Sequence, residues 1–241
     1  MVAPPYFAAH QLVPRLAHFH AEHPDVTVEI TTAWPLTAPD NERDLTIIVA
    51  HEPLHGDFVA RRLARAEVLN CAAPSYLALH GRLREPQDLA AHRLMLPPAL
   101  MSRHLSFRRV GDDAAAEERV SVTPLRAALD TMQLELNHAG ALAGLGIAGL
   151  ASYAAVESLQ DGRLEHVLPG WRLADLSIWA CLPTRRHLPA STRAFMDFLV
   201  DEFGGRDVDP WMEGLQREGR RGVEAARRVP RARSGAVALA A

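Results

Sequence analysis

The chain has 241 residues, 48% of them apolar, which is enough to bury a sizeable core in one large domain or two small lobes. All 26 basic residues are arginine, so chemistry that needs a lysine Schiff base or a lysine-bearing phosphate loop is excluded. Residues 1–204 carry 18 arginines against 24 acidic residues, a net charge of −6, which does not suit a polyanion-binding surface.

Apolar side chains at helical spacing predict a helix over residues 8–23, and Pro24 ends it because proline cannot continue a helix. Short apolar runs rich in β-branched residues then predict strands, separated by short helices and turns. The strands are predicted at residues 26–30, 44–49, 58–63, 68–72 and 94–96, and the helices at 76–80 and 86–91.

The second half continues this alternation, with a polar turn at residues 111–113 between two strands. Strands are predicted at residues 106–109, 119–122, 147–150 and 177–182, and helices at 130–143, 153–160 and 191–203. Strands that alternate with helices predict an α/β fold with mostly parallel sheets. From residue 206 the periodicity fades into Gly, Arg and Ala, so residues 205–241 are predicted to form a disordered tail, with a short helix near residues 211–215.

Two motifs match known signatures in the wrong structural context. His51-Glu-Pro-Leu-His55 has the spacing of a zinc-protease helix, but it follows a strand directly, contains Pro53 and is predicted to be a loop. Residues 144–149 match G-x-G-x-x-G, but a helix precedes them and a strand follows, the reverse of a dinucleotide site. Gly144 is better explained as the left-handed residue that ends the preceding helix.

The sequence offers no catalytic or metal-binding arrangement that we can name. There is no G-x-S-x-G nucleophile elbow, and Ser75 is more simply explained as a helix N-cap. His18, His20 and His23 crowd the end of a helix, where a solvated surface is the simpler interpretation. Cys71 and Cys181 lie in apolar runs and are predicted to be buried thiols of a reducing compartment. We therefore expect no enzyme activity, no metal and no cofactor.

A series of short stretches, each weak alone, becomes specific when taken in order over about residues 2–204. They are residues 12–19 with 23–29, 44–47, 59–63, 71–77 with 80–81, 86–92, 141–147, 162–164, 167–169, and 185–189 with 193–199. Together these stretches resemble the effector-binding (substrate-binding) domain of LysR-type bacterial transcriptional regulators.

The resemblance implies a two-lobed fold similar to type 2 periplasmic binding proteins, with two crossing hinge strands and a small molecule in the cleft. It places lobe I at about residues 1–67 and 185–204 and lobe II at about 68–184. The winged helix-turn-helix, which would contact DNA in this family, would precede residue 1 and is absent from the sequence. The chain also departs from the family at residues 44–50 and 131–133, and its segment between Ile30 and Asp44 is short.

The candidate effector-binding residues follow by analogy from the loops that would face the cleft. They are Pro5, Tyr6 and Phe7; Trp34 and Pro35; Leu100, Met101 and Ser102; Thr131, Met132 and Gln133; and Gly146 and Ile147. Loop packing alone is the competing interpretation for each residue. Because the set is largely apolar, an aromatic or weakly polar ligand is favoured over a multiply charged one.

The resulting prediction is a small-molecule-sensing domain that acts in transcription regulation through ligand-biased lobe closure, as part of a possible homodimer. DNA would be contacted only through the absent N-terminal domain. With no apolar run near the roughly 18–20 residues of a membrane helix and no signal-like start, a cytoplasmic location is expected. The alternatives are a stand-alone small-molecule-binding protein, a truncated regulator that does not bind DNA, and an α/β hydrolase or transferase, for which no nucleophile and base are evident.

Overall fold

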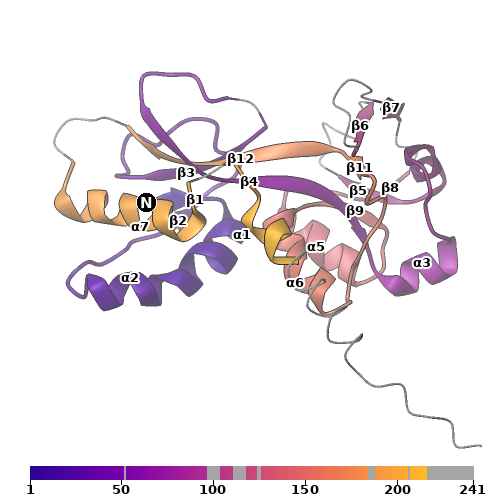
Figure 1. Cartoon of the computed structure of the whole chain (residues 1–241), viewed down its shortest axis with the longest axis horizontal. Helices are drawn as coiled ribbons and strands as arrows, with labels where there is room; N and C mark the ends of the chain where they lie inside the picture. Colours follow the sequence, from indigo (N-terminus) through magenta and orange to yellow (C-terminus); the bar gives the residue numbers. More distant parts are fainter. Residues whose placement is uncertain are drawn as a thin grey trace, which may run out of the picture.

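The computed structural model describes residues 1–51, 53–96, 104–110, 118–123, 126–183, 188–205 and 207–215. Within these residues, nine strands form one sheet whose path is β2-β1-β3-β12-β4-β9-β5-β8, with β10 paired to β4. Three further strands form a separate sheet in the order β11-β6-β7. The large sheet runs through the whole molecule, and helices gather at each of its two ends (Figure 1).

Lobe I, as we use the term, is the end of the molecule that contains α2 and α7 (Figure 1). Its three strands pair in parallel and are β1 (Val2–Ala3), β2 (Thr31–Thr32) and β3 (Thr46–Ala50). Its helical elements are α1 (Pro5–Phe7), the π-helical turn Ala8–Leu12, the 3-10 turn Val13–Arg15, α2 (Leu16–Glu22) and α7 (Ala190–Phe203).

Lobe II is the opposite end of the molecule, where β5 pairs in parallel with both β8 and β9. Its strands are β5 (Leu94–Leu96), β6 (Leu105–Arg109), β7 (Arg119–Val122), β8 (Ala127–Asp130), β9 (Ile147–Ala151), β10 (Glu165–His166) and β11 (Trp171–Arg172). Its helices are α3 (Pro74–His80), the 3-10 helix Pro86–Ala91, α5 (Leu134–Leu142) and α6 (Ser152–Gln160).

Two long antiparallel strands, β4 (Val59–Ala72) and β12 (Ala174–Leu182), connect the lobes. At one end they belong to the sheet of lobe I, where β12 pairs with β3, and at the other end β4 pairs with β9 of lobe II. Figure 1 shows both strands crossing the middle of the molecule. The predicted α/β fold with two lobes and two crossing strands is therefore confirmed. The expectation of mostly parallel sheets is wrong, because six of the pairings between the described strands are antiparallel and four are parallel. The proposed lobe boundaries at residues 67 and 185 remain a prediction.

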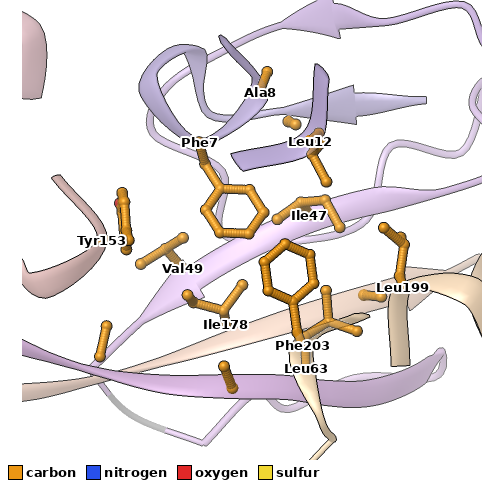
Figure 2. Packing of buried hydrophobic residues seen from close by; sticks show 14 of the residues in the cluster. Phe7, Ala8, Leu12, Ile47, Val49, Leu63, Tyr153, Ile178, Leu199 and Phe203 are labelled. Atoms are coloured by element: carbon orange, nitrogen blue, oxygen red, sulfur yellow. The ribbon is translucent and has the colours of Figure 1, made fainter. Parts of the chain in front are cut away.

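The core of lobe I forms where the helical segment after β1 meets the sheet and α7. Phe7 and Leu12 from this segment pack against Ile47 of β3 and against Phe203 of α7, all within one buried cluster (Figure 2). Tyr153 of α6 joins the same cluster, with its ring 5.4 Å from that of Phe7 in an edge-to-face arrangement. The first turn of a lobe II helix is therefore anchored in the lobe I core.

The sequence predicted two strands where the structure has the single strand β4, and a β-bulge explains the difference. Ala64 pairs with Ile178 and Arg62 pairs with Trp179, so Leu63 has no partner on β12. Leu63 and Ala64 are consecutive and both fully buried, which breaks the alternation expected of a regular strand. The predicted strand therefore ended at Leu63, although the strand continues.

Two other predicted elements have different boundaries. Residues 26–30 form no strand, although Val26, Val28 and Ile30 do pack against the lobe I core as their alternation predicted. The helix predicted over residues 130–143 begins only at Leu134, because Ala127–Asp130 pairs with β5 as strand β8. Pairing with a neighbouring strand outweighed local helix preference at this point.

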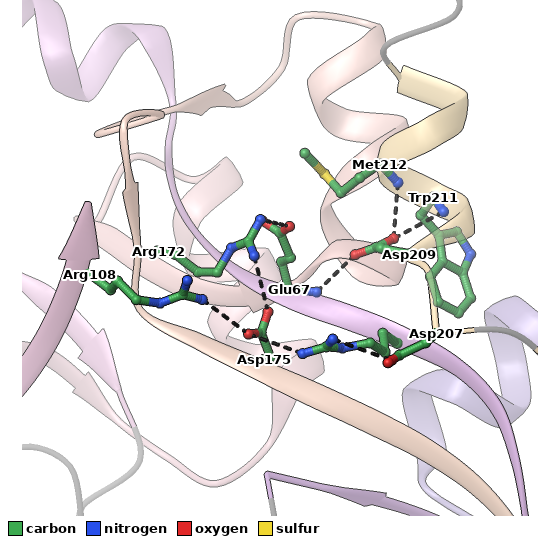
Figure 3. Close-up of polar contacts among 9 residues, drawn as sticks. Glu67, Arg108, Arg172, Asp175, Asp207, Asp209, Trp211 and Met212 are labelled. Carbon is green, nitrogen blue, oxygen red and sulfur yellow. Dashed lines mark hydrogen bonds and ion pairs between the residues drawn. The ribbon is translucent and has the colours of Figure 1, made fainter. Parts of the chain in front are cut away.

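The structure corrects the expectation that the tail begins at residue 205. Arg65 and Glu67 of β4 donate backbone hydrogen bonds to the Val208 carbonyl (3.0 Å) and the Asp209 carboxylate (2.8 Å). The Asp209 carboxylate also accepts hydrogen bonds from the backbone N–H groups of Trp211 and Met212 and so caps the short helix that residues 210–215 form (Figure 3). Residues 207–215 therefore dock along the crossing strands; residues 216–241 lie outside the described residues.

Other predictions from the sequence can be compared directly with the structure. Cys71 and Cys181 are free and buried, as predicted, and burial raises the pKa of each thiol to about 12. His51 and His55 lie in a loop, and Gly144, with φ of +72°, follows the helix α5, which confirms both motif interpretations. The turn at residues 111–113 and Glu52 lie outside the described residues. Within the described part of the chain, no helix is long and apolar enough to span a membrane.

Candidate functional site: a cavity between the lobes

A cavity of about 820 Å³ lies where the two lobes and the two crossing strands meet. This volume falls within the range of pockets that hold drug-sized molecules. Its walls come from three parts of the chain: residues 4–6, 34–37, 48–51 and 53–54 of lobe I; residues 104–106, 132–135, 137, 149, 151 and 153 of lobe II; and residues 68, 173, 174 and 176 at the crossing.

The lobe I wall follows from the direction of its strands. Because β1, β2 and β3 are parallel, their carboxyl ends lie at one edge of the sheet, and the segments that follow them line the cavity. Open α/β sheets characteristically bind ligands at this edge.

Six of the thirteen residues predicted for the site line this cavity. Pro5 and Tyr6 follow β1, and Trp34 and Pro35 follow β2, joined by a cis peptide bond. From the other lobe, Met132 and Gln133 precede α5. The structure therefore brings together three segments that are far apart in the sequence.

Seven predicted residues are not among the described residues that line the cavity. Phe7 is fully buried in the lobe I core, and Ile147 is fully buried in the core of lobe II. The Thr131 hydroxyl accepts a hydrogen bond from the backbone N–H of Gln133, so it shapes the turn before α5. A Cβ at Gly146 would lie 2.4 Å from the Arg93 carbonyl oxygen, so close packing accounts for this glycine. Leu100, Met101 and Ser102 lie outside the described residues.

The sequence analysis missed the wall formed by the end of β3 and by the loop after it, which includes His51 and Leu54. The signal that was available is the carboxyl end of a buried strand, which lies next to β1. Glu135 and Asn137 in α5 were also missed. Both follow a predicted site segment directly, so extending that segment by one helical turn would have found them.

Tyr6, which follows β1, connects the lobe I side of the cavity to lobe II. Its hydroxyl donates to the Ala154 carbonyl at 3.2 Å and lies 3.3 Å from Nδ1 of His138, and its ring stacks on His10 at 4.2 Å. Burial raises the pKa of Tyr6 to about 12, so the phenol stays protonated near neutral pH and remains a donor. Tyr6 therefore contributes an apolar face and a link between the lobes rather than a reactive group.

Few charged side chains line the cavity. Among the described lining residues, Glu135 is the one carboxylate, His51 and His104 are the titratable bases, and none is an arginine. Nδ1 of His104 lies 2.7 Å from the Thr123 hydroxyl oxygen, so one side of its ring already has a partner. A strongly anionic ligand would find no guanidinium partner among these residues.

Two buried polar atoms of lining residues have no hydrogen-bond partner among the described residues. They are Nε1 of Trp34, a donor, and Oδ1 of Asn137, an acceptor. A buried polar atom left without a partner costs about 1–3 kcal/mol. Side-chain or lobe movement that gave these atoms a partner would therefore be favoured.

One Ser–His contact bears on the hydrolase alternative. The Ser158 hydroxyl lies 3.0 Å from Nε2 of His138, but Ser158 is only 1% exposed and neither residue lines the cavity. The other ring nitrogen of His138 lies next to the Tyr6 hydroxyl rather than a carboxylate. This geometry holds α5 against α6 and gives a substrate no access to the serine.

The fold and the cavity define a class. Two α/β lobes, two crossing strands and a cavity at their junction are the architecture of two-lobed binding domains similar to periplasmic binding proteins. The chain belongs to the family described as the LysR substrate binding domain, which matches residues 1–204.

Known relatives agree with this assignment. The chain is 32% identical over 198 residues to the uncharacterized HTH-type transcriptional regulator YhjC of Escherichia coli, covering 82% of this chain and 64% of YhjC. The full-length structure of AphB, a Vibrio cholerae virulence activator, superimposes with a TM-score of 0.70 at 23% identity, covering 83% of this chain and 66% of that one. The CrgA regulatory domain of Neisseria meningitidis superimposes with a TM-score of 0.67 at 22% identity, covering 84% of this chain and 97% of that one.

The family consists of transcriptional regulators, and the matching structures include separate regulatory domains. The chain spans 64%, 54% and 61% of the length of three curated relatives, all HTH-type regulators. The described part therefore corresponds to the effector-sensing domain of this family rather than to a whole regulator.

Proposed function

We propose that the chain senses a small molecule in the cavity between its lobes and converts binding into a change in lobe closure. A ligand that contacts both lobes stabilises the closed arrangement over the open one, so binding shifts the population between them. The single observation that supports this most is that one cavity is lined by both lobes and by both crossing strands.

The cavity favours an aromatic or weakly polar ligand. Trp34, Tyr6 and Met132 offer apolar or aromatic surface, and Glu135 is the one carboxylate among the described lining residues. A ligand with one hydrogen-bond donor and an aromatic body suits this combination, whereas a multiply charged anion does not.

The remaining parts of the proposal concern partners. Regulators of this family bind DNA through an N-terminal domain, so we propose that this domain affects DNA only through such a part and through the geometry of a homodimer. The domain itself performs no catalysis, and it acts in the cytoplasm, where a bacterial regulator meets its DNA.

The direct test is a thermal-shift screen of small aromatic and weakly polar compounds on the full chain, followed by calorimetry on each hit. Met132→Ala removes surface from the lobe II wall of the cavity and should weaken a genuine effector about five- to tenfold, about 1 kcal/mol or slightly more. Leu79→Ala serves as the matched control, because Leu79 is 80% exposed on α3 and does not line the cavity.

Small-angle scattering with and without the hit then reports lobe closure, expected as a smaller radius of gyration with ligand. A hit whose affinity is the same in both variants and whose binding leaves the scattering unchanged would contradict the proposal.

A further inference from the structure

The small sheet of lobe II carries three arginines in one row. Arg172 of β11 lies directly opposite Arg108 of β6, and Arg108 lies directly opposite Arg119 of β7. Residues that face each other across antiparallel strands project their side chains to the same side of the sheet. The other side carries Phe107 and Val120, which pack in the core of lobe II. The row therefore faces away from the core.

Such a row needs negative charge nearby, because like charges at directly opposed positions destabilise a sheet. Asp175 supplies part of it and lies 3.5 Å from Arg108 and 3.8 Å from Arg172. The same carboxylate also lies 3.3 Å from Arg65 of β4, so three guanidinium groups share it (Figure 3).

The rest of the compensation comes from Glu67, which pairs with Arg172. Arg108 and Arg119 also have interactions beyond these pairs, so the row is stable as it stands. The guanidinium groups that could bind a ligand together are those of the row, Arg108, Arg119 and Arg172.

An open cavity of about 260 Å³ lies over this row. Its lining consists of the three arginines, Asp175, Ser106, Leu173 and Ala174. Nε of Arg172 is buried with no hydrogen-bond partner among the described residues, so the row retains at least one unused donor. The planar N–H fork of arginine matches the oxygen pairs of carboxylates and phosphates.

We propose that this cavity is a binding site for an anionic group, a phosphate or a carboxylate, held by Arg108, Arg119 and Arg172. Asp175 opposes the anion but is shared among three arginines, so binding is weak, about millimolar, and a singly charged group is favoured over a highly charged one. The site goes beyond the effector cavity, whose described lining contains no arginine, although the two share Ser106, Leu173 and Ala174 as a common wall.

The shared wall makes two sources of the anion possible: a free ion, or an acidic substituent of a molecule that extends from the neighbouring cavity. Inorganic phosphate represents the first, and benzoate, an apolar body with one carboxylate, represents the second. Both present the same chemistry to the arginines.

The experiment is calorimetric titration of the full chain with inorganic phosphate, and separately with benzoate, at constant ionic strength set with sodium chloride. Arg119→Gln should weaken binding at least tenfold. Arg119 is chosen because Arg108 and Arg172 hold the ion pairs to Asp175 and Glu67 described above. Arg109→Gln is the matched control, because Arg109 lies in the same sheet, on β6 next to Arg108, but faces Trp171 on the other side of the sheet, and its loss changes the net charge equally.

Asp175→Asn provides a result that misfolding cannot mimic. Removing the competing carboxylate should tighten phosphate binding about threefold or more. If benzoate binding needs both Arg119 and Trp34, the anion is an acidic group of a ligand that extends from the effector cavity. If phosphate binding needs Arg119 alone, the anion is a free ion. Either result supports the site. The proposal is overturned if neither phosphate nor benzoate binds saturably, or if Arg109→Gln weakens binding as much as Arg119→Gln. Neither failure bears on the effector cavity, which is tested by Met132→Ala.

Discussion

Trp211 offers the sharpest test of the structure, because it lies in a part of the chain that the sequence assigned to a disordered tail. Its side chain is 8% exposed, and its rings lie 5.6 Å from Tyr153 and 6.0 Å from Phe203. Its indole N–H donates to Oε1 of Gln11 at 2.9 Å. Replacing Trp211 with alanine removes all of these contacts.

The cost can be estimated from burial. An aromatic side chain that buries about 200 Å² is worth about 5 kcal/mol, and residual burial in the unfolded chain reduces this to about 3–4 kcal/mol. The lost hydrogen bond adds about 1 kcal/mol. Gln11 keeps a contact with Arg15, at 3.3 Å from Oε1, so the amide is not left without a partner. Because the segment carrying Trp211 is able to detach locally, we expect a net loss of about 3 kcal/mol.

The assay is thermal unfolding followed by circular dichroism or calorimetry. A loss of about 3 kcal/mol corresponds to a melting temperature lower by about 6–12 °C for a chain of this size. Val208→Ala is the control in the same segment, because Val208 is 37% exposed, and it should change the melting temperature by less than about 3 °C.

Truncation separates the docked segment from the residues that follow it. A chain that ends at Gly205 should lose at least as much stability as Trp211→Ala, whereas a chain that ends at Leu215 keeps every contact described above and should melt like the full chain. If Trp211→Ala and the chain ending at Gly205 both melt within 2 °C of the parent, the segment does not dock in solution and the argument is refuted.

Three further predictions follow. Trp34→Phe keeps the ring but loses the donor, so a cavity ligand should bind about fivefold more weakly, roughly 1 kcal/mol, in calorimetry, and unchanged affinity would remove Trp34 from the site. Burial lowers the pKa of His166 below 6.5, so as the pH falls His166 becomes protonated in the unfolded chain before it does in the folded chain. The melting temperature should therefore drop between pH 7.5 and 5.5, and His166→Gln should reduce that drop. With a net charge of −6 over residues 1–204, the chain should give no sequence-dependent shift of duplex DNA at nanomolar concentration and physiological salt, and such a shift would contradict the charge argument.

Elements with a clear hydrophobic pattern and clear ends were predicted well. The strand Leu94–Leu96 is found as predicted, and the helix predicted over 191–203 is α7, Ala190–Phe203. The helix is determined locally by burial along one face and by Gly204 after it, and the strand by a short buried apolar run before Pro97. Such elements need no information from distant parts of the chain.

The short helix near residues 211–215 was predicted, but the docking of this segment was not, because its apolar signal is too short. Residues 210–215 form under two turns of helix with one buried aromatic side chain, which is too short a stretch to show a hydrophobic period. What holds it is tertiary: Asp209 binds the backbone of β4, and Trp211 fits beside Gln11. The Gly- and Arg-rich composition around it predicted disorder, which is wrong for residues 207–215.

The candidate site was also predicted only in part. Trp34 and Met132 were found because a residue just after a strand or just before a helix can be located from local patterns. The wall after β3 was missed, because which strand ends face the second lobe depends on how the two crossing strands position that lobe. Phe7 and Ile147 were wrongly placed in the cavity wall because adjacent residues project their side chains in different directions. Both residues belong to segments near the cavity, but their side chains point into the lobe cores.

The bulge at Leu63 has a consequence for how this chain tolerates changes in length. A bulge places two residues opposite a single residue of the partner strand, and here these two are Leu63 and Ala64. The alternation of side chains between the two faces therefore continues in the same phase before and after the bulge. Deleting a single residue of β4 outside this pair would turn one lobe's inward side chains outward, whereas deleting Leu63 or Ala64 would keep the phase and remove the bulge. Deleting Leu63 in particular would also remove its carbonyl, which accepts a hydrogen bond from the Gly205 N–H at 3.0 Å. Related chains of different length should therefore differ within this strand by two residues, or by one residue at this position.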